Sequence, residues 1–206
     1  MNGEECYITP MLNDRSTPLS LLCTRRSGKP RDLVAPGPSP AELTDLLQVA
    51  ARTPDHGKLA PWRFVTVAPD QREAFADLLE RAWVQANPDA PRHDIDSARA
   101  FAFQAPSLVV VLSQPVPGHK VPVWEQELSA GAATMNLLHA SHALGYAAGW
   151  LTGWASTSEA VRAAFGPLGS RVVAFVFIGT PTRPLDERPR PDLTQLVQPW
   201  RPEGLD

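Results

Sequence analysis

The distribution of proline places the strongest constraint on how this chain of 206 residues folds. Proline has a fixed φ and no backbone N–H, so helix interiors and central strands exclude it. The 22 prolines are about twice as many as an average usage of roughly 5% would give. None lies between Val123 and Gly166, whereas six follow Thr180. We therefore expect the proline-free block to hold regular core structure and the end of the chain to be neither helix nor central strand.

Composition excludes several classes of protein. A chain of this length buries roughly 70% of its unfolded surface around one core, which favours a single domain. A net charge of −3 argues against a nucleic-acid surface, which normally carries an excess of basic side chains. The longest apolar runs, residues 108–112 and 172–178, are much shorter than the roughly 20 residues of a membrane helix. Glu4 and Glu5 also occupy a terminus that a signal peptide would make basic. We predict a cytoplasmic protein that binds neither nucleic acid nor membranes.

Capping residues and apolar spacing predict the order of the elements. Thr17 and Pro18 mark the start of one helix, and Ser39, Pro40 and Glu42 form a capping box at the start of the next. The predicted helices are residues 18–27, 40–51, 70–86, 93–104, 122–144 and 157–165, and the predicted strands are residues 62–67, 107–113, 146–151 and 171–178. No linker divides this series. We therefore expect an irregular leader over residues 1–16, one domain over residues 17–182 and a proline-rich extended arm over residues 183–206.

Three segments carry residues suited to chemistry, and each also has a purely structural interpretation. Arg25, Arg26 and Ser27 follow the first helix, where arginines complement the helix dipole, but guanidinium and hydroxyl groups also bind phosphate. Consecutive helical residues point about 100° apart, so only one of the two arginines is expected to face a given ligand. His139 and His142 lie three residues apart on one helix face, which is typical of metal ligands and of packed core histidines alike.

The third segment, residues 118–126, has the highest density of residues suited to chemistry. His119, Lys120, Glu125 and Gln126 surround the start of the longest predicted helix, whose free N–H groups favour anions. A helix start with acids in its first turn would look the same without any ligand. Common nucleotide, zinc and hydrolase motifs such as G-x-G-x-x-G, H-E-x-x-H and G-x-S-x-G are absent from the sequence.

Taken together and in order, these segments resemble the FMN-dependent nitroreductase family, and within it the short NAD(P)H nitroreductase branch. The resemblance covers about residues 18–182. Its matching segments are Arg25-Arg26-Ser27, residues 51–56 with 61–64, residues 119–122 with 124–127 and 129–131, residues 144–146 with Trp150 and Gly153, and residues 178–181.

The resemblance implies an α+β fold in which helices flank a mixed, mostly antiparallel sheet. It implies a homodimer with FMN in a groove between the subunits, and a carboxyl-terminal arm that wraps the partner. The implied FMN contacts are Arg25, Arg26, Ser27, Lys29, Arg52, His56, Trp150, Leu151 and Thr152. Lys29 would lie beside the flavin ring, where a cation stabilises the negative charge of the reduced form.

The sequence departs from the family pattern at two places. The branch commonly reads Trp-Arg-Ser-Gly where this chain has Trp150-Leu151-Thr152-Gly153, so one arginine is missing, and Arg183, Arg188 or Arg190 could replace it. Lys58 and Ala60 stand where many relatives have asparagine and glutamine.

The leading functional hypothesis is that FMN accepts hydride from NAD(P)H and reduces a small organic acceptor such as a nitroaromatic or a quinone. The chemistry would take place on the flavin, with no catalytic side chain and no metal, while His119, Lys120, Glu125 and Gln126 shape the acceptor pocket. Two alternatives stay open: a non-catalytic flavin- or ligand-binding dimer, and a metal-dependent hydrolase that uses His139 and His142.

Overall fold

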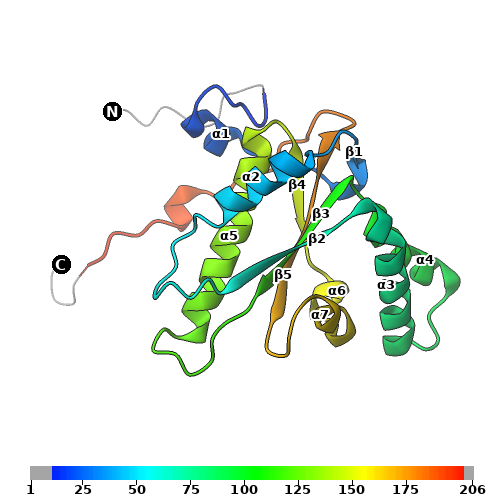
Figure 1. Cartoon of the computed structure of the whole chain (residues 1–206). Coiled ribbons are helices and arrows are strands. Elements are labelled where there is room, and N and C mark those ends of the chain that lie inside the picture. The colour runs from blue at the N-terminus through cyan, green and yellow to red at the C-terminus, as the bar shows by residue number, and fades with distance from the viewer. Residues whose placement is uncertain (1–10, 202–206) are drawn as a thin grey trace.

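The computed structural model describes residues 11–201, and over this range five strands form one antiparallel sheet with helices on both faces (Figure 1). The strands are β1 (Leu33–Val34), β2 (Trp62–Val67), β3 (Ser107–Ser113), β4 (Ala147–Leu151) and β5 (Arg171–Pro181). The helices are α1 (Pro18–Thr24), α2 (Pro40–Ala50), α3 (Arg72–Ala86), α4 (Arg92–Ala100), α5 (Val123–Ala143), α6 (Trp154–Thr157) and α7 (Glu159–Phe165), and short 3-10 turns occur at Pro30–Asp32, Pro69–Gln71, Phe101–Phe103 and Leu193–Gln195. The α+β prediction is confirmed.

The sheet is built around β5. One edge of this strand pairs with β3 over residues 171–178, and β3 pairs in turn with β2. The other edge pairs with β4, and the far end of β5, at Thr180 and Pro181, pairs with β1. Every pairing between described strands is antiparallel, so the expectation of a mixed sheet is not met in this part of the chain.

Both faces of the sheet are buried, which explains the unbroken apolar run of β3. Successive side chains of a strand point to opposite faces, and accordingly Leu108 and Val110 pack in one core cluster while Val109 and Val111 pack in the other. The first cluster lies under α3, α6 and α7 and contains Phe75 and Phe175. The second lies under α2 and α5 (Figure 1).

Local signals set the helix starts. Thr17 Oγ1 accepts the Ser20 N–H at the start of α1, and Ser39 and Glu42 form the predicted capping box of α2. The helix predicted from residue 70 begins instead at Arg72, because Gln71 accepts the Ala68 N–H and closes a 3-10 turn ahead of it. In the described residues no helix is both long and apolar enough to cross a membrane.

Several predicted boundaries were wrong. The first helix ends at Thr24 rather than before Gly28. The helix predicted over 157–165 begins at Glu159, because Ser158 caps it by accepting the Val161 N–H, and the short helix α6 before it was not predicted. The last strand continues beyond Ile178 to Pro181, where it pairs with β1, a strand of two residues that the sequence pattern did not predict.

Candidate functional site

Residues 25–29 run alongside β4, and two glycines allow this approach. The Gly28 N–H donates to the Ala148 carbonyl over 3.1 Å. A Cβ at Gly149 would stand 2.7 Å from the Gly28 carbonyl oxygen, and one at Gly28 would stand 2.8 Å from a methyl group of Leu33. Side chains at either position would therefore push the segment away from the strand.

The segment and the strand together border an open pocket of about 420 Å³. Of the predicted cofactor residues, the structure brings Arg26, Ser27, Lys29, Trp150 and Leu151 together in its lining. Sequence reasoning missed Arg31 and Gln104, and it named Arg188 only as one of three arginines able to replace the arginine missing at Leu151. The lining residues are Arg26, Ser27, Gly28, Lys29, Pro30, Arg31, Gln104, Gly149, Trp150, Leu151 and Arg188.

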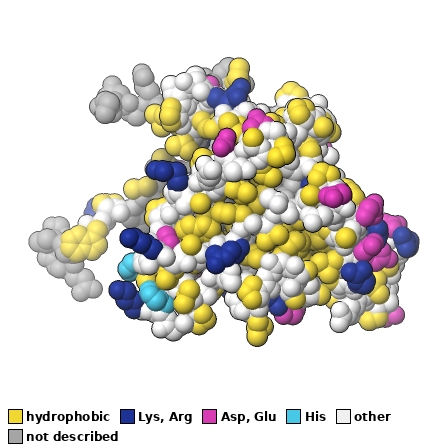
Figure 2. All heavy atoms as spheres, in the orientation of Figure 1, with side chains coloured by type: hydrophobic (Ala, Val, Ile, Leu, Met, Phe, Trp, Pro, Cys, Tyr) yellow, Lys and Arg dark blue, Asp and Glu magenta, His cyan; other side chains and the backbone are white. Residues whose placement is uncertain are grey.

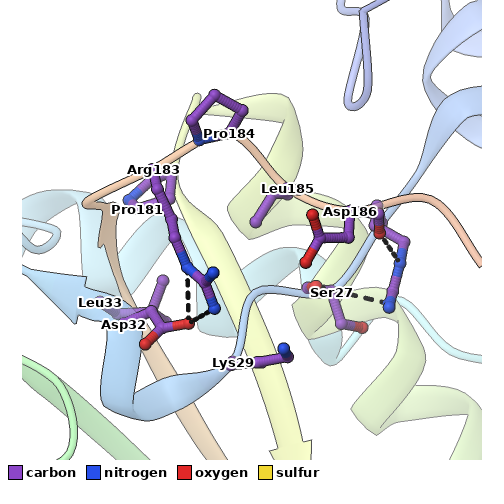
Figure 3. A pocket seen from close by; sticks show the side chains of 10 residues that line it. Ser27, Lys29, Asp32, Leu33, Pro181, Arg183, Pro184, Leu185 and Asp186 are labelled. Carbon is purple, nitrogen blue, oxygen red and sulfur yellow. Dashed lines mark hydrogen bonds and ion pairs between the residues drawn. The ribbon is translucent and has the colours of Figure 1, made fainter.

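The charge of this pocket is its main chemical feature. Arg26, Lys29, Arg31 and Arg188 line it, and none of the described residues of its lining carries a carboxylate. The acids nearby, Asp32 and Asp186, belong to a smaller adjoining hollow, which they share with Arg183 (Figure 3). The open pocket is therefore suited to an anionic ligand.

Trp150 gives the pocket an aromatic wall. Its indole N–H donates to the Val173 carbonyl over 3.1 Å, which fixes the ring on the sheet. Leu151 packs against the core beside it, and Thr152, the next predicted contact, is exposed and does not line the pocket.

The two consecutive arginines have different surroundings, as the sequence analysis predicted. Arg26 lines the pocket, whereas Arg25 is half-buried and its Nη1 donates to Ser27 Oγ over 3.2 Å. Burial lowers the pKa of Arg25, and the nearby positive charges of Arg190 and Arg26 lower it further. Positive charges are thus crowded here, and a bound anion would relieve their mutual repulsion.

A second group of predicted residues lies at the start of α5. His56 Nδ1 and Glu125 Oε1 are 2.6 Å apart, and Ser129 Oγ donates to the Pro54 carbonyl over 2.6 Å. The imidazole of His119 lies close to Gly57, because a Cβ built there would be 3.4 Å from it. Arg52 and Lys120 are exposed. Histidine and basic side chains gather over these loops in Figure 2.

The position of Gln126 differs from the sequence prediction, which expected this residue to shape the acceptor pocket. Its side chain is buried, with Nε2 donating to the Val116 and Val121 carbonyls and Oε1 accepting the Val116 N–H. All of these contacts hold the loop before α5 in place. Gln126 therefore supports the loop and does not present its amide to a pocket.

The two groups lie at opposite ends of α5. Glu125 is in the first turn of this helix, whereas His139 and His142 are in its last turns. Burial lowers the pKa of both histidines, and the charge of Arg25 lowers it further, which places Arg25 near this end. Residues 125 and 142 are separated by about 25 Å at about 1.5 Å per residue. The predicted site residues of one chain thus form two separate groups.

Of the two histidines on α5, His142 is packed in the core, whereas His139 is partly exposed. His142 is buried and its Nδ1 lies 3.2 Å from the Tyr146 carbonyl oxygen, while Nε2 has no hydrogen-bond partner among the described residues. Burial lowers the pKa of His142 to about 4. Over residues 11–201 no group of three or more histidine, cysteine, aspartate or glutamate side chains is placed to hold a metal ion, so the hydrolase alternative finds no ligand set there.

The fold and the pocket on β4 define an α+β protein with a basic ligand pocket, and comparison with known proteins gives the family. The model of the Nitroreductase family matches residues 24–180, and the chain belongs to this family. It is 38% identical over 164 residues to the Escherichia coli K12 protein named "Putative NAD(P)H nitroreductase YdjA", covering 79% of this chain and 87% of that one.

Solved structures agree on the fold. A nitroreductase-like protein from Bacillus cereus superposes with a TM-score of 0.77 at 20% identity, covering 92% of this chain and 97% of that one. The NADPH:FMN oxidoreductase from Vibrio harveyi, solved with NAD+, superposes with a TM-score of 0.66 at 16% identity, covering 88% and 76%. The protein is an oxidoreductase of the Nitroreductase family.

Proposed function

We propose that this protein binds FMN, takes hydride from NAD(P)H and reduces a small organic acceptor such as a nitroaromatic or a quinone. The observation that carries the proposal is the pocket on β4, where four basic side chains and an indole ring meet without any carboxylate in the described lining. A flavin mononucleotide has a matching chemistry, with a phosphate at one end and a planar ring at the other. The names of the Escherichia coli and Vibrio harveyi proteins point to the same reactants.

The residues of the pocket divide into two roles. Arg26 and Ser27 would bind the phosphate, because a guanidinium offers two parallel N–H donors and a hydroxyl offers a third. Arg25 orients the Ser27 hydroxyl. Lys29 would place a positive charge beside the ring, where it would stabilise the negative charge gained on reduction. FMN supplies hydride acceptance and electron transfer, so no side chain is required as a nucleophile.

We further propose that the protein is a cytoplasmic homodimer. Each cofactor site would combine the pocket on β4 of one subunit with the residues at the start of α5 of the other. The separation of the two groups along α5 supports this arrangement, because one chain alone cannot place both around one small ligand. Val123, Trp124 and Leu128 on α5 are exposed apolar side chains, and Gly131 has open space beside it. A second copy packed on this face would bury them and bring its Arg52, His56, His119 and Lys120 toward the pocket.

The visible spectrum of freshly purified protein tests the proposal most directly. We expect a yellow protein whose flavin absorbance is bleached by NADH or NADPH under nitrogen and recovers when a quinone is added. A colourless protein that takes up no added FMN would contradict the cofactor assignment. A yellow protein that neither nucleotide bleaches would instead favour a non-catalytic flavin-binding dimer.

Substitution of the two arginines tests the phosphate assignment. Arg26→Ala removes a guanidinium from the pocket lining, and we expect the dissociation constant of FMN to rise by about 10- to 100-fold, the range for a lost charged hydrogen bond. Arg25→Ala should weaken FMN retention to a smaller extent, because this side chain acts through Ser27. Flavin content equal to that of wild type in both variants would count against the assignment.

A further inference from the structure

The loop of residues 52–60 is held in place from two sides. Its His56 imidazole pairs with Glu125 of α5 over 2.6 Å. Within the loop, the two carboxylate oxygens of Asp55 accept two backbone N–H groups, over 3.1 and 2.7 Å. The backbone from which Lys58 extends is therefore fixed next to the start of α5.

Two lysines flank a close contact between this loop and the loop before α5. A Cβ built on Gly57 would lie 3.4 Å from His119 Cε1 and 3.4 Å from a methyl group of Val121. Lys58 directly follows this glycine, and Lys120 lies between the other two residues in the sequence. Both lysines are exposed. They therefore extend into solvent from two backbone segments that lie against each other.

No carboxylate of this surface pairs with the two lysines. The three acids of residues 52–60 and 118–127 all bind other groups, namely backbone N–H groups for Asp55, His56 for Glu125 and Arg171 for Glu127. The ammonium groups of both lysines form neither a hydrogen bond nor an ion pair with any residue that the structure describes. The charge that this surface offers to a ligand is therefore positive.

This positive surface contrasts with the chain as a whole, which carries a net charge of −3. Basic side chains gather on this part of the molecule (Figure 2). Fixed cations beside a site raise the local concentration of anions and speed their association. The pocket on β4 has its own cations for the FMN phosphate. The two lysines are thus left for a second anion.

We propose that Lys58 and Lys120 select an electron acceptor that carries a carboxylate beside its reducible group, such as a nitrobenzoate. This inference rests on the proposed function, since it names the substrate class of the same site. Two ammonium groups that extend from neighbouring segments can each donate to one oxygen of a carboxylate. Both lysines act on binding alone, because the carboxylate takes no part in the reduction.

The reduction needs no proton from either lysine. The nitro group gains two electrons and two protons, loses one oxygen as water and becomes a nitroso group. The electrons and one proton come from flavin reduced by NAD(P)H, and the second proton comes from solvent.

Reoxidation of reduced enzyme isolates the acceptor step from the nucleotide step. The holoenzyme is reduced with stoichiometric dithionite under nitrogen and mixed with 4-nitrobenzoate or with uncharged 4-nitrobenzamide, and stopped flow follows the return of flavin absorbance. For the double variant Lys58→Met/Lys120→Met, we expect the second-order rate constant to fall by about 3- to 10-fold with 4-nitrobenzoate and to stay within about twofold with 4-nitrobenzamide. Each acceptor is compared only with itself, so the different reduction potentials of the two compounds cancel.

Charge and position are controlled separately. Lys58→Arg/Lys120→Arg keeps both charges and should react with 4-nitrobenzoate faster than the methionine variant does. Arg81→Met, which removes an exposed cation on α3, is the matched control and should behave like wild type. Raising the ionic strength from about 0.01 to 0.5 M should slow wild type with 4-nitrobenzoate more than it slows the methionine variant.

Equal losses with the two acceptors, or no loss with either, would overturn the selection of a carboxylate. Slower bleaching of the oxidised methionine variant by NADH or NADPH, with an unchanged acceptor step, would assign the lysines to the nucleotide and would also overturn it. Reduced wild type that neither nitro compound reoxidises would overturn the inference, and failure with a quinone as well would overturn the proposed function. Wild-type protein that binds no FMN would overturn the proposed function at its first step.

Discussion

At the scale of single residues, His142 makes stability depend on pH. Burial lowers its pKa from about 6.5 to about 4, while its hydrogen bond to the Tyr146 carbonyl opposes the shift. The unfolded chain therefore binds a proton between pH 6.5 and pH 4 that the folded chain does not, so stability is complete above pH 6.5 and falls as the pH drops toward 4. The loss between pH 7.5 and pH 5 is about 2 kcal/mol.

Urea unfolding at pH 7.5 and pH 5 measures this contribution. His142→Asn keeps a donor for the Tyr146 carbonyl but cannot titrate, so we expect its free energy of unfolding to change less between the two pH values than that of wild type. His93→Asn replaces an exposed histidine on α4 and is the matched control. An unaltered pH dependence in His142→Asn would show that another group is responsible.

Single residues also show that the direction in which a side chain points is not predictable from the sequence alone. The polar cluster from His119 to Gln126 was a reasonable pocket candidate by composition, yet Gln126 points inward and binds its own loop. Arg25 and Arg26 differ in their surroundings as expected, but the helical spacing behind that expectation does not apply, because α1 ends at Thr24, before either residue. Which of the two lines the pocket follows only from the path of the segment along β4.

At the scale of elements, a buried arginine joins pieces of the fold that are distant in sequence. Arg72, at the start of α3, is 5% exposed and donates to the Val67, Ala102 and Pro106 carbonyls over 3.1, 2.6 and 3.2 Å. These carbonyls belong to the end of β2, to the turn after α4 and to the residue before β3. Burial lowers the pKa of Arg72.

Replacement of Arg72 should destabilise the whole domain. Arg72→Met fills much of the same volume but leaves three carbonyls without their donor, and we expect a loss of about 2 to 4 kcal/mol in the free energy of unfolding. Arg81→Met, an exposed substitution on the same helix, should change it by less than about 0.5 kcal/mol. Urea unfolding of both variants decides the matter, and equal stabilities would refute a role for Arg72 in joining these elements.

Elements with local signals were predictable from the sequence, and those defined by pairing were not. The capping box at Ser39 and the prolines at Pro18 and Pro40 fix helix starts through contacts within a few residues. By contrast, β1 has two residues and exists only because β5 extends to meet it. Residues 25–29, 150–151 and 188 are distant in sequence but lie together around the pocket. No periodic pattern in the sequence predicts that they lie together. The family resemblance supplied the first two segments, whereas Arg188 sits in a proline-rich region without periodicity.

At the scale of the whole molecule, the end of the chain has two parts. Residues 182–190, called the clasp here, are fastened to their own subunit by Asp32 and Arg26. The following described stretch, residues 191–201, leaves Leu193, Leu196, Val197 and Trp200 exposed by 61% to 85%. Several exposed apolar side chains in one short stretch are typical of a surface that binds a partner. We therefore propose that the predicted arm across a dimer consists of the residues after the clasp.

Two truncations separate these parts. Deletion of residues 192–206 removes the exposed apolar stretch but keeps Arg188, which lines the pocket, so we expect a weaker dimer whose FMN content recovers as protein concentration is raised. Deletion of residues 184–206 also removes the clasp beyond Arg183, and its FMN content should stay low at every concentration. Analytical ultracentrifugation, together with flavin absorbance, measures both quantities. If the shorter deletion left the dimer as tight as the full chain, the arm would have no part in assembly, and its apolar side chains would need another partner.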